Sequence, residues 1–424
     1  MGIPFYSQRN APTTPGNGHK GLWFERFFNQ YDSDWRVIPP NPQAHIDEGK
    51  KQWIKTVAGR CGDGKALEGF AVRQANLCAA LGGQSRAFLT DWHFATGMGN
   101  PHPVENGFAW HPTLGVPYLT GAAVKGIVRA WVEGWMSPED FPGANESERE
   151  NNRLATLYRW FGSEDKDFKK RKELREAGFS PPSQGRDLDT EAGAFVFFDA
   201  IPLKPVTLAC DVMTPHYGKW YEQGGEIQNA AREPDKVPAD WDDPVPVPFL
   251  VVKAGSFLFS IAPRTREASK EIEAVMEALQ GALAYLGAGA KTAVGYGAMS
   301  RDISSEGDLR RLQEEQEKQA QAAAEAARIE AERIQKLSTM DPFDRGIQEN
   351  ADGRIDKTQS EISFILNLAK NGRWQGEEKI RVGRWIEEKM RGAGEWKEQT
   401  QKKNPQKDKE YQNTCLVKSW LNEH

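Results

Sequence analysis

The hydrophobic pattern between Ser85 and Ser300 changes its period in a fixed order, and this order restricts the fold more than any other feature of the chain. Apolar residues in alternation or in short β-rich runs predict strands at 85–96, 194–200, 206–213 and 292–300, and a hairpin at 247–261. Apolar residues three and four positions apart predict helices at 64–82, 119–135 and 267–286. The order β–α–β–β–α–β, with an extra hairpin, predicts an α+β fold: a ferredoxin-like (RRM-like) βαββαβ core in which one sheet carries two helices on one face.

Helix and turn signals support these boundaries. Thr120 is of a residue type that caps helix N-termini. Glycine at 287 ends a helix readily because it adopts the left-handed conformation without strain. The predicted hairpin turns at Ala254 and Gly255.

Two segments interrupt the pattern. Residues 137–193 contain a highly charged run followed by a proline- and glycine-rich run, so we expect a surface insertion; a nucleic-acid patch is the alternative. Residues 215–243 are polar, divided by prolines and rich in Trp and Tyr, and we expect a long projecting loop there.

Composition changes abruptly after Ser300. The stretch that follows is rich in Ala, Glu, Gln and Arg, with mixed charges four positions apart and a thin apolar stripe, which predicts a solvated single helix. The last part shows short apolar stripes, which predict a small helical module with exposed tryptophans at 374, 385, 396 and 420. We therefore expect three parts: a core at 1–300, a charged helical linker at 301–340 and an α-helical extension at 341–424.

Charge and cysteine content exclude several classes of protein. The formal charge of -5 means that a nucleic-acid site has to be a local patch rather than a whole-protein field. The four cysteines form no CxxC pair, which argues against a zinc ribbon and a disulfide framework. No stretch approaches ~20 uninterrupted apolar residues, and the first residues lack a signal-peptide pattern. We expect a cytoplasmic protein with no membrane partner, cofactor or metal.

The strongest candidate binding segment is LGAGAKTAVGYG at 286–297. Its glycines allow positive φ and bring backbone N–H groups close to phosphate oxygens, Lys291 adds a positive charge and Tyr296 an aromatic face for stacking. A nucleotide P-loop needs glycine directly before the lysine, whereas here Ala290 precedes it and the loop runs from helix to strand. A tight turn explains one or two glycines but not four with a lysine. We predict RNA contact by Gly287, Gly289, Lys291, Thr292, Gly295, Tyr296 and Gly297.

A second candidate is LGVPYLTGAAVKGIVRAW at 114–131. Gly121 opens the predicted helix, and a helix N-terminus can hold a phosphate. Lys125 and Arg129 lie four residues apart and repel each other, which makes sense if an anion lies between them. Gly126 costs ~1 kcal/mol relative to alanine inside a helix, a cost that close packing or a nearby backbone would justify. An ordinary solvated basic face is the alternative interpretation.

Several segments together resemble a known family: HPTLGVPYLTGAAVKGIVRAW, FFDAIPLKP followed by DVMTPHY, PVPVPFLVV and GAGAKTAVGYG. They occur in this order within 85–300 and resemble RAMP superfamily proteins of type III-B (Cmr) CRISPR effector complexes, most closely the type of backbone subunit that caps the guide-RNA 3′ end. Leu119, Thr120 and Gly121 depart from the family pattern, in which a Pro-Gly-Ser turn is usual. The tail after Ser300 lies outside the resemblance.

The resemblance implies a non-catalytic subunit that binds the 3′ part of the guide RNA and caps the backbone filament in antiviral RNA-targeting defence. It implies guide CRISPR RNA, target RNA and other Cmr-complex subunits (backbone, small and neighbouring RAMP subunits) as partners. His216 and Tyr217 of DVMTPHY join Gly121, Lys125, Arg129 and the glycine loop as expected RNA-binding residues. Whether the 215–243 loop contacts guide, target or a neighbouring subunit stays open.

The competing hypothesis is a metal-independent RAMP endoribonuclease that processes RNA. Acids, bases or ligands could come from six residues: His93, His102, His111, His216, Asp199 and Asp211. No pair has a metal-ligand spacing such as HxxxH, so we expect these side chains to organise the fold rather than to catalyse. For Asp211 and His216 the expected contacts are each other or the neighbouring backbone.

Overall fold

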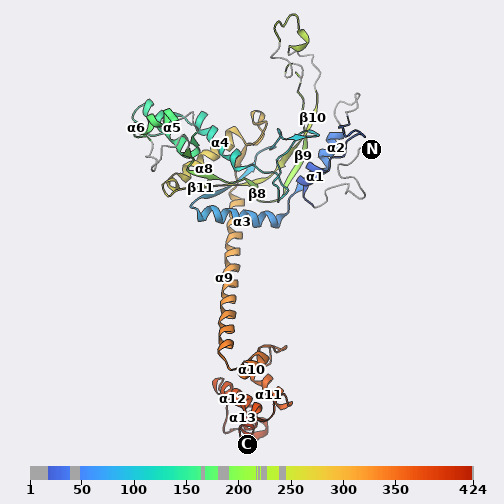
Figure 1. Ribbon diagram of the computed structural model, residues 1–424, viewed down its shortest axis with the longest axis vertical. Coiled ribbons are helices and arrows are strands. Elements are labelled where there is room, and N and C mark those ends of the chain that lie inside the picture. Colours follow the sequence, from blue (N-terminus) through green and yellow to red (C-terminus); the bar gives the residue numbers. More distant parts are fainter. Residues whose placement is uncertain are drawn as a thin grey trace. The chain divides into compact units, whose positions relative to one another are not determined.

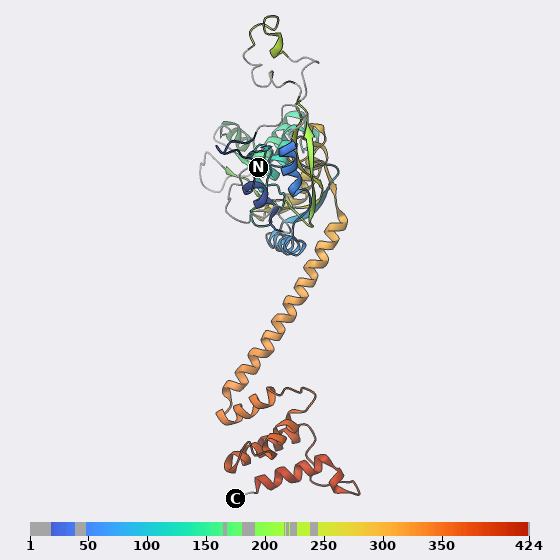
Figure 2. The same ribbon diagram turned by 90° about the vertical axis from the view of Figure 1, so that its right-hand side faces the viewer.

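The computed structural model describes residues 18–38, 48–163, 168–179, 191–215, 217, 220, 227–237 and 245–422. It separates into two compact units, Met1–Glu315 and Gln316–His424. Helix α9 (Ile303–Thr339) is one continuous helix that begins in the first unit (Figure 2).

The main sheet of the first unit is antiparallel, with strand order β12–β2–β11–β7 and with β8 also paired to β11. Its strands are β2 (Gln84–Thr90), β7 (Phe195–Phe197), β8 (Ile201–Pro202), β11 (Ser256–Pro263) and β12 (Met299–Arg301). Helix α4 (Gly121–Gly134) connects β2 to β7 across β11, and α8 (Ile272–Gly281) connects β11 to β12 across β2. This is the split βαβ arrangement that the predicted element order requires, with α4 and α8 close together over the sheet (Figure 1).

The predicted helix ends of this core are confirmed. Thr120 caps α4, because its Oγ1 accepts a hydrogen bond from the Ala123 N–H at 3.1 Å. Beyond α8 the chain makes one π turn, Ala282–Leu286, and stops at Gly287, whose φ is 72°. Between the helices and the sheet lie the fully buried rings of Phe88, Phe257 and Phe259.

The opposite face of the sheet is covered by α3 (Gly64–Ala80). Ala71 and Val72 of this helix pack in one buried cluster with Ala87 of β2 and Leu258 of β11. RRM proteins stack bases on their open sheet face. Since α3 packs on that face here, the face is not open in the way that the RRM sheet face is.

A second antiparallel sheet has the order β1–β9–β10, from Gly59–Cys61, Val206–Met213 and Val247–Ala254. The predicted hairpin at 247–261 is wrong, because β10 pairs with β9 while β11 pairs with β2 in the main sheet. Gly255 alone separates the two strands, and it exchanges hydrogen bonds with Thr90 at 3.0 and 3.2 Å. The segment between β9 and β10 contains the predicted 215–243 loop, most of which lies outside the described residues.

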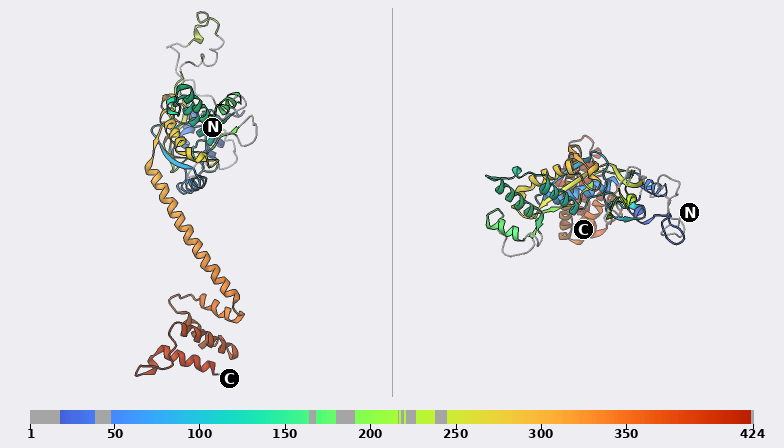
Figure 3. Two further views of the ribbon diagram at one scale, coloured as in Figure 1. Left: turned by 90° about the vertical axis from the view of Figure 1, so that its left-hand side faces the viewer. Right: turned by 90° about the horizontal axis from the view of Figure 1, so that it is seen from above.

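The prediction of a surface insertion at 137–193 is wrong for α5 (Glu146–Phe161). This helix buries Leu157, Trp160 and Phe161 in the main core, and Glu271 accepts hydrogen bonds from Arg159 and Trp160. Helix α5 packs beside α4, and α6 (Phe168–Glu176) packs on α5 (Figure 3). The remaining α-helices and strands of the first unit, within the described residues, are α1 (Lys20–Arg26), α2 (Glu48–Val57), β3 (Pro101–His102), β4 (Glu105–Asn106), β5 (Gly162–Ser163) and β6 (Glu191–Ala192).

The first turns of α9 pack on the first unit. Leu309 is 6% exposed and contacts the cluster that holds Ala71 and Leu203. One turn later, the Gln313 side chain donates a hydrogen bond to Asn76 of α3 at 2.6 Å. The beginning of the helix therefore belongs to the core by packing.

The second unit contains α10 (Pro342–Asp352), α11 (Glu361–Lys370), α12 (Gly376–Gly392) and α13 (Lys409–Leu421). The expectation of exposed tryptophans is corrected: Trp374, Trp385 and Trp420 are 4–9% exposed, and Trp396 packs partly buried against them. They pack with the buried aliphatic side chains of the four helices and complete this unit's own core. None of the helices in the described ranges has the length and apolarity that crossing a membrane requires.

Candidate nucleic-acid interface

The glycine loop after α8 is folded back onto the segment that follows β2. The N–H of Ala288 donates to the carbonyl of Gly297, and the N–H of Gly297 donates to that of His93, both at 2.8 Å. The N–H of Ala290 donates to the carbonyl of Ala95, also at 2.8 Å. The loop is therefore tied at both ends to residues 93–95.

Close backbone contacts inside the protein explain most of the loop's glycines. All four have positive φ, between 72° and 93°. A Cβ on Gly287, Gly289 or Gly297 would lie 1.9–2.8 Å from a carbonyl oxygen of the chain itself, whereas a Cβ on Gly295 would meet nothing nearer than 4.0 Å. The sequence argument that a turn cannot account for four glycines is therefore corrected, and the glycines do not by themselves indicate a ligand.

Lys291 is the loop's cation, and the fold presents it in an unusual way. It has a left-handed backbone with a φ of 60°, uncommon for a non-glycine residue. Its Nζ lies 5.5 Å from the ring centre of Phe249, 5.8 Å from that of Tyr296 and 4.0 Å from the sulfur of Met213. No carboxylate among the described residues forms an ion pair with it. Two aromatic rings thus stabilise the positive charge of Lys291.

Beneath Lys291, Tyr296 and His93 converge on one carboxylate. Oδ2 of Asp211 accepts from the Tyr296 hydroxyl at 2.6 Å and lies 2.9 Å from Nδ1 of His93. Burial alone would raise the pKa of Asp211, but hydrogen bonds from Tyr296, the Val212 N–H and His93 outweigh it and hold the pKa below its usual range. Burial and the Asp211 carboxylate raise the pKa of Tyr296. His93 is an imidazole partner of Asp211 in the described chain, and His216, the partner expected from the sequence, lies outside the described residues.

The prediction of Tyr296 as a stacking face is corrected, because its side chain is only 6% exposed. The exposed aromatic ring at this site is Trp92, which is 49% exposed, stacks on the His93 ring at 5.0 Å and tilts against Tyr296 at 4.7 Å. In a continuous strand over the predicted range 85–96, Trp92 would lie on the same face as Phe88. The strand ends at Thr90, however, so Trp92 leaves that face and turns to the surface.

The second candidate segment differs from its prediction at Gly121. The Gly121 N–H already donates to Oδ1 of Asp199 at 2.7 Å, and a Cβ there would lie 2.1 Å from the Phe197 carbonyl. Thr120 accepts from the Ala123 N–H, so two of the N–H groups at the start of α4 are bonded to the protein's own oxygens, one of them charged. The Asp199 carboxylate at the Gly121 N–H disfavours a phosphate at that position through charge repulsion.

Lys125 and Arg129 do share one face of α4, as predicted, and a third cation joins them. Burial, and then repulsion from Arg129 and Arg264, lowers the pKa of Lys125. Arg129 lies 3.6 Å from Glu133, while Lys125 has no ion-pair partner within the described ranges. Nothing lies within 4 Å of a Cβ built on Gly126, so close packing inside the chain does not explain that glycine.

The other residues expected to bind RNA, or to serve the competing endoribonuclease hypothesis, lie in structured positions or outside the described residues. Thr292 starts a short 3-10 turn at the loop tip, and Tyr217 is half-buried; His216 lies outside the described residues. His102 lies 2.9 Å from the Phe24 carbonyl, and burial lowers the pKa values of His102 and His111. Within the described chain no cluster of His, Cys, Asp or Glu could hold a metal ion.

The comparisons with known proteins agree with this architecture. The RAMP superfamily model matches residues 87–300, half of the chain, from β2 through the glycine loop to β12. The chain belongs to the RAMP superfamily. This RAMP protein is 30% identical over 246 residues to the CRISPR system Cmr subunit Cmr6 of Pyrococcus furiosus. That match covers 50% of the chain and 65% of the relative's own length.

Two solved structures are also similar to this RAMP protein. One is a cryo-EM structure of the type III-B Cmr-beta bound to cognate target RNA, with 18% identity, a TM-score of 0.36, and coverage of 60% of this chain and 71% of that one. The other is the crystal structure of Cmr6 from Pyrococcus furiosus, with 25% identity, a TM-score of 0.28, and coverage of 52% and 98%.

Proposed function

We propose that this RAMP protein is a non-catalytic backbone subunit of a type III-B CRISPR ribonucleoprotein. In this role it binds the 3′ part of the guide RNA, caps the backbone filament and takes part in antiviral RNA-targeting defence. Its partners are the guide RNA, the target RNA and the neighbouring Cmr-type subunits. The Cmr subunit from Pyrococcus furiosus supports the assignment to this kind of complex.

The observation that carries the proposal is the pairing of Lys291 with Trp92 at one loop edge. A cation without an ion-pair partner in the described chain lies over Tyr296, and Trp92, half exposed, packs on the same ring. Single-stranded RNA is bound by this combination, in which a cation contacts the phosphate and an aromatic ring stacks on a base. Because α3 covers the sheet face, this loop edge is a surface through which the core can contact an RNA strand.

A non-catalytic role is supported by the way the acidic groups are used. Asp199 caps α4, and Asp211 accepts from Tyr296, His93 and a backbone N–H. Tyr296 has a raised pKa and donates its proton inward, so it is a poor general base. The endoribonuclease alternative rests on one observation, the His93–Asp211 pair near Lys291, because a carboxylate-oriented imidazole can act as a base.

The test of RNA binding is the charge reversal Lys291→Glu, measured with a single-stranded RNA that matches the guide's 3′ part. We expect affinity to fall about tenfold or more, since a hydrogen bond to a charged group contributes about 1.5–3 kcal/mol. The slope of log affinity against log salt should flatten by about one unit or less, the loss of one phosphate contact. Lys125→Glu should add to the effect if Lys125 and Arg129 also contact the strand.

Lys65→Glu is the matched control, because Lys65 is exposed on α3 and the substitution changes the net charge equally. Unchanged affinity and slope in Lys291→Glu, or an equal loss in Lys65→Glu, would contradict the proposal. The purified chain should also leave RNA intact with Mg²⁺, with Mn²⁺ or with a chelator. Cleavage that disappears in His93→Ala, His216→Ala or Asp211→Asn would favour the endoribonuclease instead.

A further inference from the structure

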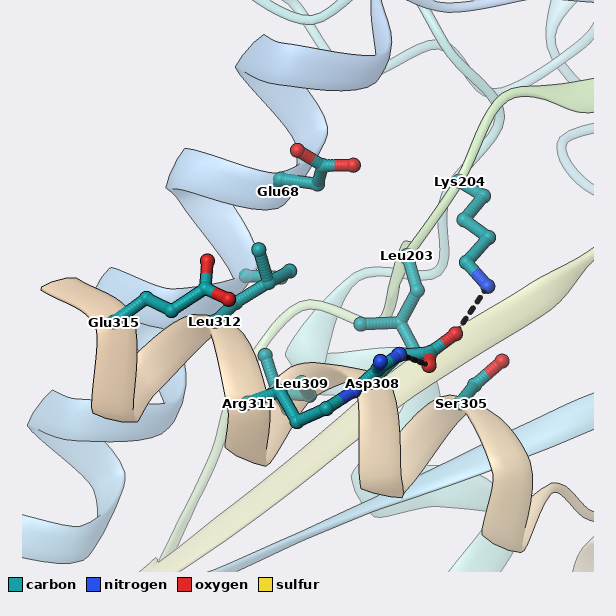
Figure 4. A pocket seen from close by; sticks show the side chains of 10 residues that line it. Glu68, Leu203, Lys204, Ser305, Asp308, Leu309, Arg311, Leu312 and Glu315 are labelled. Atoms are coloured by element: carbon teal, nitrogen blue, oxygen red, sulfur yellow. Dashed lines mark hydrogen bonds and ion pairs between the residues drawn. The ribbon is translucent and has the colours of Figure 1, made fainter.

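A hollow of about 250 Å³ lies away from the glycine loop, between α3, the residues after β8 and the first turns of α9 (Figure 4). Its floor is apolar and is formed by Ala71, Leu203, Leu309 and Leu312. Ala71, Leu203 and Leu309 are at most 6% exposed, so the floor belongs to the folded core and is present before any partner binds.

The rim of the hollow has an excess of negative charge. Lys204 and Arg311 both pair with one carboxylate, that of Asp308, at 2.6 Å in the case of Lys204. Glu68 of α3 and Glu315 of α9 also line the rim, and neither has an ion-pair or hydrogen-bond partner in the part of the chain described (Figure 4). The charges of this rim sum to −1, since Asp308, Glu68 and Glu315 outnumber the two cations, and Glu68 and Glu315 are the carboxylates that neither cation pairs with.

Size and chemistry together define what fits this hollow. Its volume is below the range of about 300–1,000 Å³ typical of small-molecule sites. An arginine or lysine side chain has an aliphatic stem that packs on apolar surface and a cationic head that stays at the polar rim. The leucine floor suits the stem, and Glu68 and Glu315 suit the head. A phosphate backbone, in contrast, would meet uncompensated carboxylates.

We propose that this hollow docks a basic side chain, arginine or lysine, presented by a neighbouring protein subunit. The partner would place the side chain over Leu309 and Leu312 and pair its charge with Glu68 and Glu315. This makes the junction of α3 and α9 a protein-docking surface, separate from the glycine loop that contacts RNA. The inference rests on the proposed function insofar as the partner is a subunit of the same ribonucleoprotein.

The test uses the full chain, co-expressed with the other subunits and guide RNA and purified through a tag on another subunit. Native mass spectrometry then measures the fraction of complexes that carry wild-type chain or the Glu68→Lys/Glu315→Lys variant. We expect the variant to be retained at least about tenfold less, because like charges in an interface cost several kcal/mol. Its melting temperature and its affinity for free RNA should not fall. Hydrogen exchange at 64–80 and 303–315 should be slower in the wild-type complex than in the free chain.

The matched control is Glu314→Lys/Glu317→Lys, which changes the same charge on exposed positions of α9 outside the hollow. Equal retention of wild type, variant and control would overturn the docking site alone. RNA cross-links at 303–315, or equal loss in the control, would overturn it as well. Absence of the wild-type chain from the complex would instead refute the proposed function, so the two failures are distinguishable.

Discussion

Two glycines of the loop differ in a way that predicts their mutational cost. Gly295→Ala places a methyl group in open space, so the expected cost is that of a left-handed alanine, about 1 kcal/mol. Gly297→Ala carries the same conformational cost, but its Cβ would lie 1.9 Å from the Ala288 oxygen. The backbone must move, and the hydrogen bonds of Gly297 with Ala288 and His93 are lost.

At about 1 kcal/mol for each hydrogen bond, Gly297→Ala should lower the free energy of unfolding by about 3–4 kcal/mol. Urea unfolding followed by tryptophan fluorescence measures both values under one condition. In Gly297→Ala the displaced loop should also weaken RNA binding, whereas Gly295→Ala should bind nearly as wild type. Equal destabilisation by the two substitutions would refute the argument that the chain's own backbone, rather than a ligand, requires glycine at 297.

Three further outcomes can be measured. Asp211→Asn should lower the free energy of unfolding by about 1–3 kcal/mol at neutral pH. Because the pKa of Asp211 is depressed in the folded state, this difference should shrink as the pH falls below about 4. A difference that does not change with pH would contradict this expectation. A chain ending at Glu315 should melt like the first unit of the full protein. A chain ending at Ser305 loses Leu309 and should be about 2–5 kcal/mol less stable. Identical melting of the two chains would place the boundary between the core and the helical linker at 300. Arg264→Glu should weaken RNA binding less than Lys291→Glu, and an equal loss in a parallel RNA titration would mean that the cations around Lys125 matter as much as the loop.

Local signals in the sequence predicted the helix ends, which depend on residues that are neighbours along the chain. The cap at Thr120 and the helix stop at Gly287 were both predictable, because each depends on one residue's own hydrogen bond or φ. Which β-strands pair with each other could not be predicted in this way. The run around Gly255 reads as a hairpin, yet one residue is too short for the two-residue turn that a hairpin needs, and β10 and β11 enter different sheets.

Burial was the other property that the sequence did not reveal. Tyr296 and Trp92 are both aromatic residues within segments predicted as strands, and only the tertiary contacts decide that Tyr296 is covered and Trp92 is exposed. The partner of Asp211 was equally hidden, since His93 lies 118 positions away. Trp92 lies beyond the end of β2 at Thr90, and the sequence did not mark this end, because the alternation of apolar residues continues past it.

The single residue between β10 and β11 has a mechanical consequence. Gly255 is hydrogen-bonded to Thr90 at the end of β2, and Val252 of β10 exchanges hydrogen bonds with Phe94 at 2.8 and 2.9 Å. The end of β2 and the residues after it are therefore hydrogen-bonded to both sheets. Ala290, one residue before Lys291, is bonded to Ala95 of that same segment. A rotation of one sheet against the other would have to break these bonds together. These bonds restrain the backbone of Lys291 relative to that of Trp92 in the free chain. An RNA strand that contacts both residues would therefore bind without a large entropy cost for ordering them.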